Sequence, residues 1–242
     1  MGVNIKLFFV FAFIKCVFCK EALTVPCNHN DLECFKTMAL SIFNHTSAGA
    51  PEYSLEPIDP LEIQKMEYTE PASDIVFEFE NIKITGFKNQ KLEDFQMNTD
   101  TKAVAYRMRV EVDIAADVSI KLNEATQNLF GTYKAKATSV EVVWHSYSLT
   151  VGSDGIEHYT IGPETISCEP VGVPEVIIDL QHSNTVAKDP DANAKRAGYL
   201  KKATEIKQKP VCTIITEAYK YVLAQFRTIT DTEPKTAFFK DL

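Results

Sequence analysis

The most constraining feature of this sequence is a long alternation of apolar and polar residues between Val104 and Leu122. Every even-numbered residue in the segment is apolar, counting Tyr106, and the odd positions carry charged residues such as Arg107 and Glu111. Alternation at period two is typical of a β-strand with one dry and one wet face. Such a strand would be roughly 60 Å long, about three times the usual length, so we expect it to curve around a helix or a lipid.

Segments on either side of this strand predict an antiparallel sheet. Ile75, Phe77 and Phe79 alternate, whereas Ile82 and Ile84 continue in the opposite phase, which predicts a strand with a bulge. The other expected strands are an edge strand ending near residue 97, a returning strand over 130–151, and two strands over about 156–168 and 173–180. The proline-containing segment 51–61 is expected to be an extended connector.

Two helices are predicted by apolar residues at helical spacing. Asp31 can cap the first helix, which we expect to run to Ala48 with an apolar stripe along one side. The stripe between Val211 and Ile229 predicts a long helix that is covered on most of its circumference. Apolar residues upstream can extend that helix, although Pro210 should kink or interrupt it. The pattern therefore predicts an α+β fold in which a curved antiparallel sheet wraps a long C-terminal helix.

The first residues have the pattern of a secretory signal. Lys6 precedes an apolar run over 7–14, and the segment ends at residues 17–19 before the charged Lys20 and Glu21. Because the run is too short to span a bilayer, we expect cleavage after Cys19 rather than an uncleaved membrane anchor. Residues 20–242 then form a single domain, since no repeat or linker divides them.

The cysteines agree with an extracellular protein. Four cysteines follow the expected cleavage point, and two disulfides among them have three possible pairings. Cys27 and Cys34 can close a short loop at the start of the first helix, which leaves Cys168 and Cys212 to join a late strand to the C-terminal helix. Zinc is the alternative, but no CxxC pair or histidine cluster supports it.

The charge balance limits the classes of partner. The formal net charge is −8 at pH 7, which argues against binding to nucleic acid or to an anionic membrane surface. We expect a secreted monomer without a cofactor or a stable membrane insertion.

Three blocks of residues resemble one protein family. The blocks are Pro51, Tyr53, Pro57, Asp59, Pro60 and Leu61; residues 84–90 with 94–97; and Pro163, Glu164, Thr165, Cys168 and Glu169, with Phe238 and Phe239 near the end of the chain. Together they resemble the insect juvenile-hormone-binding proteins of haemolymph, within the wider takeout family. The similarity covers essentially all of residues 20–242.

This resemblance implies a TULIP-type fold, or super-roll, with an N-terminal gate helix over an apolar pocket. It implies the same disulfides as the spacing, Cys27 with Cys34 and Cys168 with Cys212. The implied function is a carrier that binds juvenile hormone, a sesquiterpenoid epoxide ester, transports it in haemolymph and shields it from hydrolysis. His145 stands where the hormone carriers present a tyrosine hydroxyl to the epoxide, and an imidazole can also donate one hydrogen bond.

The expected ligand contacts come from four parts of the chain: His145, Tyr133, Phe35, Met38, Ile42, Tyr219, Leu223 and Phe238. On the returning strand, small residues from Gly131 to Ser139 share a phase with Tyr133 and His145. A small face can line a cavity, or it can let the helix approach closely. The stripe on the first helix can likewise be a lid or ordinary core.

An enzyme, an interaction module and a carrier of another ligand are the alternatives to a carrier of juvenile hormone. A secreted esterase would need a nucleophile, but the sequence has no G-x-S-x-G elbow. A secreted interaction module and a related carrier of another apolar ligand remain alternatives. Asn44 begins a glycosylation sequon on the first helix, where we expect an exposed side chain.

Overall fold

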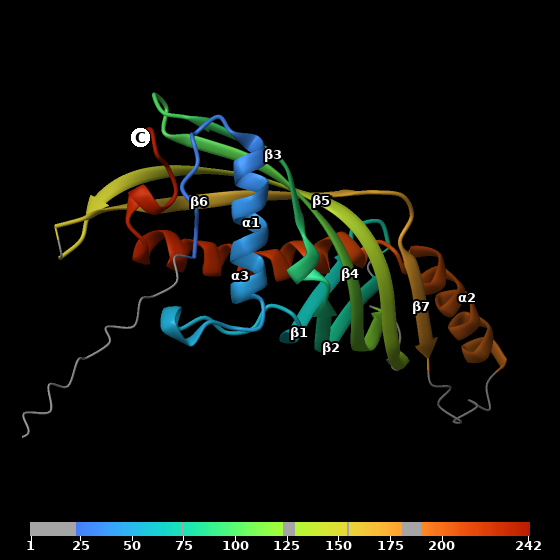
Figure 1. Cartoon of the computed structure of the whole chain (residues 1–242). Helices are drawn as coiled ribbons and strands as arrows, with labels where there is room; N and C mark the ends of the chain where they lie inside the picture. Colours follow the sequence, from blue (N-terminus) through green and yellow to red (C-terminus); the bar gives the residue numbers. More distant parts are fainter. Residues whose placement is uncertain (1–22, 74, 123–128, 154, 181–189) are drawn as a thin grey trace, which may run out of the picture.

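The computed structural model describes residues 23–73, 75–122, 129–153, 155–180 and 190–242. Figure 1 shows a curved antiparallel sheet that wraps the long helix α3 (Pro210–Thr232), while α1 (Leu32–Thr46) crosses the open side of the sheet. None of the helices in these ranges is long and apolar enough to cross a membrane. The expected signal, residues 1–19, lies outside the described residues.

Two very long strands form the centre of the sheet. β4 (Ala103–Leu122) and β5 (Leu129–Val151) pair antiparallel in one unbroken register from Ala103 opposite Ser146 to Ile120 opposite Leu129. The long strand predicted from the alternation is therefore confirmed. Its dry face packs into the core, because the even-numbered side chains from Val104 to Ile120 are buried except for the half-buried Tyr106.

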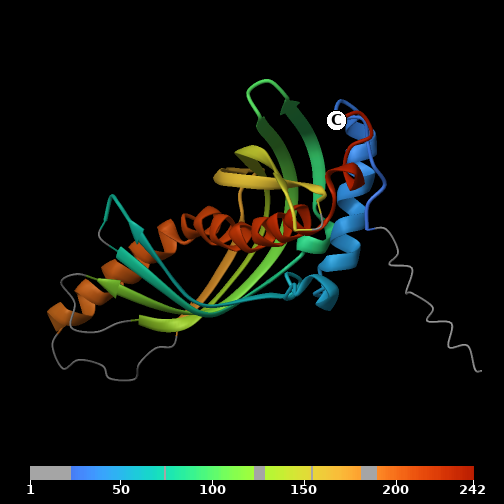
Figure 2. The same cartoon turned by 90° about the vertical axis from the view of Figure 1, so that its left-hand side faces the viewer.

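Each long strand is flanked by two shorter strands placed end to end. β2 (Ile75–Thr85) pairs with the second half of β4, and β3 (Lys91–Asn98) pairs with its first half. In the same way, β6 (Glu157–Pro170) and β7 (Glu175–Leu180) follow each other along β5, and β1 (Leu61–Glu70) completes the sheet beside β2. The breaks between the paired short strands let the sheet turn, and Figure 2 shows its two ends diverging around α3.

One of these breaks depends on a glycine. Gly86 precedes the 3-10 turn η2 (Phe87–Asn89) between β2 and β3 and has a φ of +116°. A Cβ atom at this position would lie 2.0 Å from the carbonyl oxygen of Glu111 on β4, so only glycine fits without a shift of the backbone. The predicted bulge in β2 is also confirmed, because its register with β4 shifts between Glu80 and Lys83.

The helices agree with the predicted patterns. Asp31 caps α1 through its side chain, and the helix ends at Thr46, two residues before the expected Ala48. α2 (Pro190–Ile206) stops before α3 begins at Pro210, which confirms the predicted interruption. α3 is buried along most of its length between the strands.

Two elements between residues 51 and 70 were not predicted. Residues 51–61 are not only a connector, since η1 (Pro51–Tyr53) lies within them. β1 begins at Leu61, where no strand was predicted. In the structure, the burial of its residues does not alternate regularly. An edge strand has one neighbour and a partly solvated surface, so its side chains carry a weaker periodic signal.

Candidate functional site

An apolar cavity lies between α1, α3 and the part of the sheet that contains β3, β6 and the adjoining ends of β4 and β5. Its lining from the two helices consists of Phe35, Met38, Ala39, Ile42, Phe43, Tyr219, Val222, Leu223, Phe226 and Thr230. The sheet and the C-terminal segment contribute Leu92, Phe95, Met97, Val104, Tyr106, Met108, His145, Tyr147, Tyr159, Ile161, Phe238 and Phe239. The cavity volume is about 110 Å³. This is below the roughly 300 Å³ of the smaller typical ligand sites, so a larger ligand would require the walls to move.

α1 forms one wall because its apolar stripe faces the cavity. The Asp31 carboxylate accepts a hydrogen bond from the backbone N–H of Cys34 at 3.0 Å, which fixes the first turn. The ring of Phe35 packs 4.3 Å from that of Phe95 on β3, and Phe43 lies 6.1 Å from Phe226 on α3. Figures 1 and 2 show α1 standing across the C-terminal part of α3. These contacts are between aromatic side chains, and among the described residues no backbone hydrogen bond joins α1 to the sheet.

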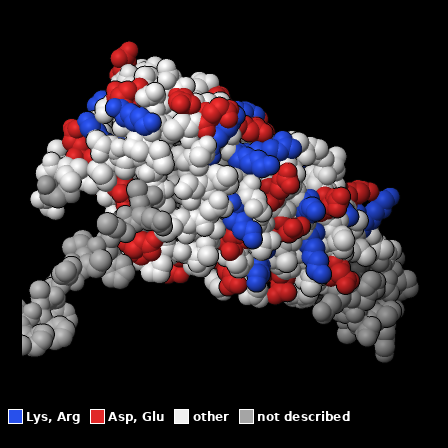
Figure 3. Space-filling model, viewed as in Figure 1, with Lys and Arg blue, Asp and Glu red and all other residues white. Residues whose placement is uncertain are grey.

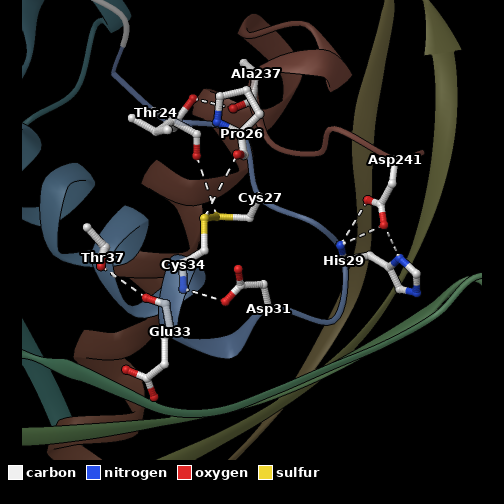
Figure 4. Close-up of a disulfide and its surroundings, with 11 residues drawn as sticks. Thr24, Pro26, Cys27, His29, Asp31, Glu33, Cys34, Thr37, Ala237 and Asp241 are labelled. Atoms are coloured by element: carbon white, nitrogen blue, oxygen red, sulfur yellow. Dashed lines mark hydrogen bonds and ion pairs between the residues drawn. A yellow bond between two sulfur atoms is a disulfide. The ribbon is translucent and has the colours of Figure 1, made fainter.

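The two ends of the chain meet beside this wall, in a contact that we call the terminal clasp: residues 24–29 paired with residues 237–241. The backbone N–H of Cys27 donates to Phe238 at 2.9 Å, and the N–H of Lys240 donates back to Cys27 at 2.9 Å. Figure 4 shows Cys27 also joined by a disulfide to Cys34 in the first turn of α1. The clasp therefore connects α1 to the C-terminal segment that brings Phe238 into the cavity.

A hydrogen-bonded pair, His29 and Asp241, closes the outer end of the clasp. The Asp241 carboxylate lies 2.7 Å from Nδ1 of His29 and also accepts from the backbone N–H of His29 at 3.0 Å (Figure 4). The hydrogen bond from the His29 ring is the main cause that lowers the pKa of Asp241.

The second disulfide joins the sheet to α3. Cys168 on β6 is bonded to Cys212 in the first turn of α3, with their Cα atoms 5.7 Å apart. Both pairs have the partners expected from the sequence. Among the described residues, no group of His, Cys, Asp and Glu side chains could hold a metal ion.

His145 lies in the cavity wall, and its ring has one assigned hydrogen bond. Nδ1 is 3.0 Å from the carbonyl oxygen of Ser146. Burial lowers the pKa of His145, so the neutral ring is favoured. A carbonyl oxygen only accepts, which places the single proton of the neutral ring on Nδ1 and leaves Nε2 as an acceptor. This geometry differs from the donor role expected for His145 at the ligand.

Three tyrosines in the wall were not among the predicted contacts: Tyr106, Tyr147 and Tyr159. The Tyr106 ring lies edge-on to His145 with the ring centroids 6.0 Å apart. Tyr147 and Tyr159 form a similar pair at 5.5 Å. Tyr106 was counted only as an apolar member of the long strand, although its place in the inward phase could have marked it as a cavity hydroxyl.

A small polar cluster lies beneath the cavity floor. Tyr219, one of the predicted contacts, donates from its hydroxyl to Oε1 of Gln90 at 3.2 Å. Glu141 is 0% exposed and accepts from the Ser139 hydroxyl at 2.8 Å, and burial raises its pKa to about 7. Nε2 of Gln90 and Oε2 of Glu141 are buried without a hydrogen-bond partner in the described residues.

Tyr133 does not line the cavity, and the prediction that it does is wrong. Its side chain is 0% exposed, its hydroxyl donates to the carbonyl of Lys207 at 2.9 Å, and its ring packs edge-on to Phe79 at 5.0 Å. Tyr133 and His145 share one face of β5, but twelve residues of extended chain separate them by roughly 40 Å. Two residues in the same phase of an alternation lie on the same face of a strand. Their phase does not say how far apart they lie along it.

The small residues of the same strand do not line the cavity either. Ala137 and Ser139 lie beside Val211 and Ile215 at the beginning of α3. At Gly131 a Cβ atom would lie 2.1 Å from the carbonyl oxygen of Asp179 on β7. The small face therefore allows close approach of the helix and of β7, which was the alternative interpretation.

The remaining predicted contacts come together in one place. Phe35, Met38, Ile42, Tyr219, Leu223, Phe238 and His145 all line the cavity. Asn44 lies on α1 with an exposed side chain, as its sequon requires.

Comparisons with known proteins agree with this architecture. Residues 7–161 match the family described as haemolymph juvenile hormone binding protein. The chain is 34% identical over 224 residues to the juvenile hormone-binding protein of Manduca sexta, covering 91% of this chain and 97% of that protein. The crystal structure of Takeout 1 from Epiphyas postvittana superposes with a TM-score of 0.69 at 14% identity, covering 89% of this chain and 99% of that one, and it shows the shared fold. The chain therefore belongs to the haemolymph juvenile hormone binding protein family.

Proposed function

We propose that this protein is a secreted carrier that binds juvenile hormone in the cavity beneath α1, transports it in haemolymph and shields it from hydrolysis. The observation that carries the proposal is the almost wholly apolar cavity enclosed by α1, α3 and the sheet. The relative from Manduca sexta is a juvenile hormone-binding protein by name, and its likeness extends over most of both chains.

A cavity enlarged by movement of its walls would bury enough apolar ligand surface for a carrier. Burial of about 400 Å² of apolar ligand surface contributes roughly 10 kcal/mol. The entropy lost on association offsets several kcal/mol of this, which leaves affinities in roughly the micromolar to nanomolar range. An ester held in the dry cavity is also separated from water, so its hydrolysis should slow.

Binding without catalysis is part of the proposal. The established family is one of binding proteins, and the sequence lacks the nucleophile elbow of a secreted esterase. Charged residues are interspersed on the face seen in Figure 3, with no extended basic patch there for a polyanion. We propose a monomer whose partner is the small ligand.

Secretion is supported by features of the chain. The two disulfides are typical of an oxidising compartment, and the first residues have the pattern of a signal. Glycosylation at Asn44 is proposed on the same basis, since its side chain is exposed on α1.

The test uses the full chain expressed in insect cells and purified from the medium. Native mass spectrometry before and after addition of juvenile hormone III should show one ligand per chain. Ala39→Trp should weaken this binding at least tenfold because Ala39 lines the cavity, whereas Leu40→Trp should not because Leu40 is 49% exposed on the same helix.

Two outcomes would contradict the carrier. The first is a folded Ala39→Trp variant that binds as tightly as the wild-type protein. The second is hydrolysis of bound hormone by the pure protein, which would indicate an esterase. A different co-purified small molecule would identify a carrier of another apolar ligand.

A further inference from the structure

The Tyr106 hydroxyl is a polar group at the cavity that lacks a hydrogen-bond partner within the described part of the chain. Tyr106 lines the cavity from β4, and its ring is fixed edge-on against His145 at 6.0 Å. The residue keeps intermediate exposure, although it lies in the middle of the inward face between the buried Val104 and Met108. Because Tyr106 lines the cavity, part of its remaining accessible surface faces the cavity.

The chemistry of this hydroxyl suits a hydrogen-bond donor. Burial is the main cause that raises the pKa of Tyr106, and the carboxylate of Glu164 raises it further. Glu164 is itself held by Arg227, whose Nη2 donates to both of its carboxylate oxygens. The hydroxyl is therefore protonated at physiological pH, and it can donate its hydrogen to a ligand acceptor in an otherwise apolar cavity.

The other polar groups of the wall are less suited to this role. His145 uses its Nδ1 proton on the carbonyl of Ser146 and offers only an acceptor. Tyr219 already donates to Gln90. Tyr147 and Tyr159 form a separate ring pair, with their centroids 5.5 Å apart, and burial raises the pKa of both hydroxyls.

We infer that the Tyr106 hydroxyl donates a hydrogen bond to an acceptor oxygen, such as an ester carbonyl, of the apolar ligand held in the cavity. The inference rests on the proposed function and names the class of ligand that the site selects: an apolar chain that carries a hydrogen-bond acceptor. Binding of such a ligand satisfies the hydroxyl, whereas a pure hydrocarbon leaves it unpaired. The discrimination that results is about fivefold, since one neutral hydrogen bond is worth roughly 1 kcal/mol.

The experiment compares two probes of similar size by calorimetric titration of the full chain. Methyl farnesoate has an ester as its one polar group, and β-farnesene is a hydrocarbon. Tyr106→Phe should lower the affinity for methyl farnesoate about fivefold. The affinity of this variant for β-farnesene should stay within twofold of the wild-type value. Tyr221→Phe is the matched control, because it removes a tyrosine hydroxyl from a side chain on α3 that is 48% exposed and does not line the cavity, and it should change neither affinity.

A second measurement does not depend on the folding of any variant. The infrared carbonyl stretch of methyl farnesoate carrying a ¹³C-labelled ester should move to lower frequency on binding to the wild-type protein, because the carbonyl accepts a hydrogen bond. An unshifted stretch would overturn the inference. It would also be overturned by a folded Tyr106→Phe variant with unchanged affinities, or by His145→Phe removing the ester preference while Tyr106→Phe keeps it. Failure of the wild-type protein to bind either probe would instead overturn the carrier function itself.

Discussion

The backbone N–H of Cys27 donates to the carbonyl oxygen of Phe238 at 2.9 Å, and this bond joins the beginning of the described chain to a residue of the cavity wall. Cys27 is also bonded to Cys34 in the first turn of α1. The two walls formed by α1 and by the C-terminal segment are therefore connected through one residue. Movement of α1 should displace Phe238, because the disulfide and the terminal clasp connect the two.

The first prediction concerns the movement of α1 on ligand binding. The cavity of about 110 Å³ is too small for a sesquiterpenoid without displacement of its walls, and α1 is held mainly by side-chain packing. Hydrogen exchange of residues 32–43 should slow when juvenile hormone III is bound, and residues 24–29 should slow with them. Equal exchange with and without bound hormone would show that α1 is a fixed wall.

The second prediction concerns the acid sensitivity of the terminal clasp. Because the pKa of Asp241 is lowered in the folded protein, its bond to His29 stabilises the clasp above the ordinary carboxyl pKa. That stabilisation is lost as the pH falls through the lowered value. Hydrogen exchange of residues 24–29, corrected for intrinsic rates, should therefore be faster at pH 2.5 than at pH 6. Asp241→Asn should exchange rapidly at both values, and a variant that keeps the wild-type pH dependence would refute this role.

The third prediction concerns the buried carboxyl of Glu141. Burial raises its pKa to about 7, so between about pH 4.5 and 7 the folded protein holds a proton that the unfolded chain has lost. The free energy of unfolding should therefore fall as the pH rises through this window, by about 3 kcal/mol from this group. Glu141→Gln keeps a neutral side chain of similar shape and should remove that loss.

Urea unfolding of the wild-type protein and Glu141→Gln at several pH values measures this effect. The two stabilities should diverge as the pH rises, with the variant more stable relative to the wild-type protein at pH 8 than at pH 4.5. Parallel pH profiles would show that Glu141 titrates normally. The hydrogen bond from Ser139 lowers the pKa of Glu141, so it opposes the divergence and does not produce it.

The fourth prediction separates Tyr133 from the ligand site. Tyr133→Phe removes the hydrogen-bond donor to the carbonyl of Lys207, so the free energy of unfolding should decrease by about 1 kcal/mol. The affinity for juvenile hormone III should stay within twofold, because Tyr133 is remote from the cavity. Chemical denaturation and calorimetric titration of the same preparation give both values. If the affinity falls by more than the loss of stability explains, Tyr133 contributes to ligand binding.

Local features of this protein were predictable from the sequence because they depend on periodicity and on residue chemistry. The alternation from Val104 to Leu122 predicted β4, the change of phase after Phe79 predicted the bulge in β2, and Pro210 marked the beginning of α3. A residue's phase decides which face it occupies within one strand or helix. The family resemblance, carried by short motifs, then supplied the arrangement of these elements.

Only the tertiary structure decided which of the inward-facing residues meet at the cavity. Tyr133 and His145 share a face of β5, yet one is packed near Lys207 and the other lines the cavity wall, because a strand of this length passes through different surroundings. The same holds for Tyr106. The alternation of its segment predicts that it faces inward, whereas neighbours from other strands decide whether its hydroxyl has a hydrogen-bond partner. Sequence periodicity determines which face of a strand or helix a side chain occupies. The surroundings of that side chain along a curved sheet, and its hydrogen-bond partners, depend on contacts between segments that are distant in the sequence.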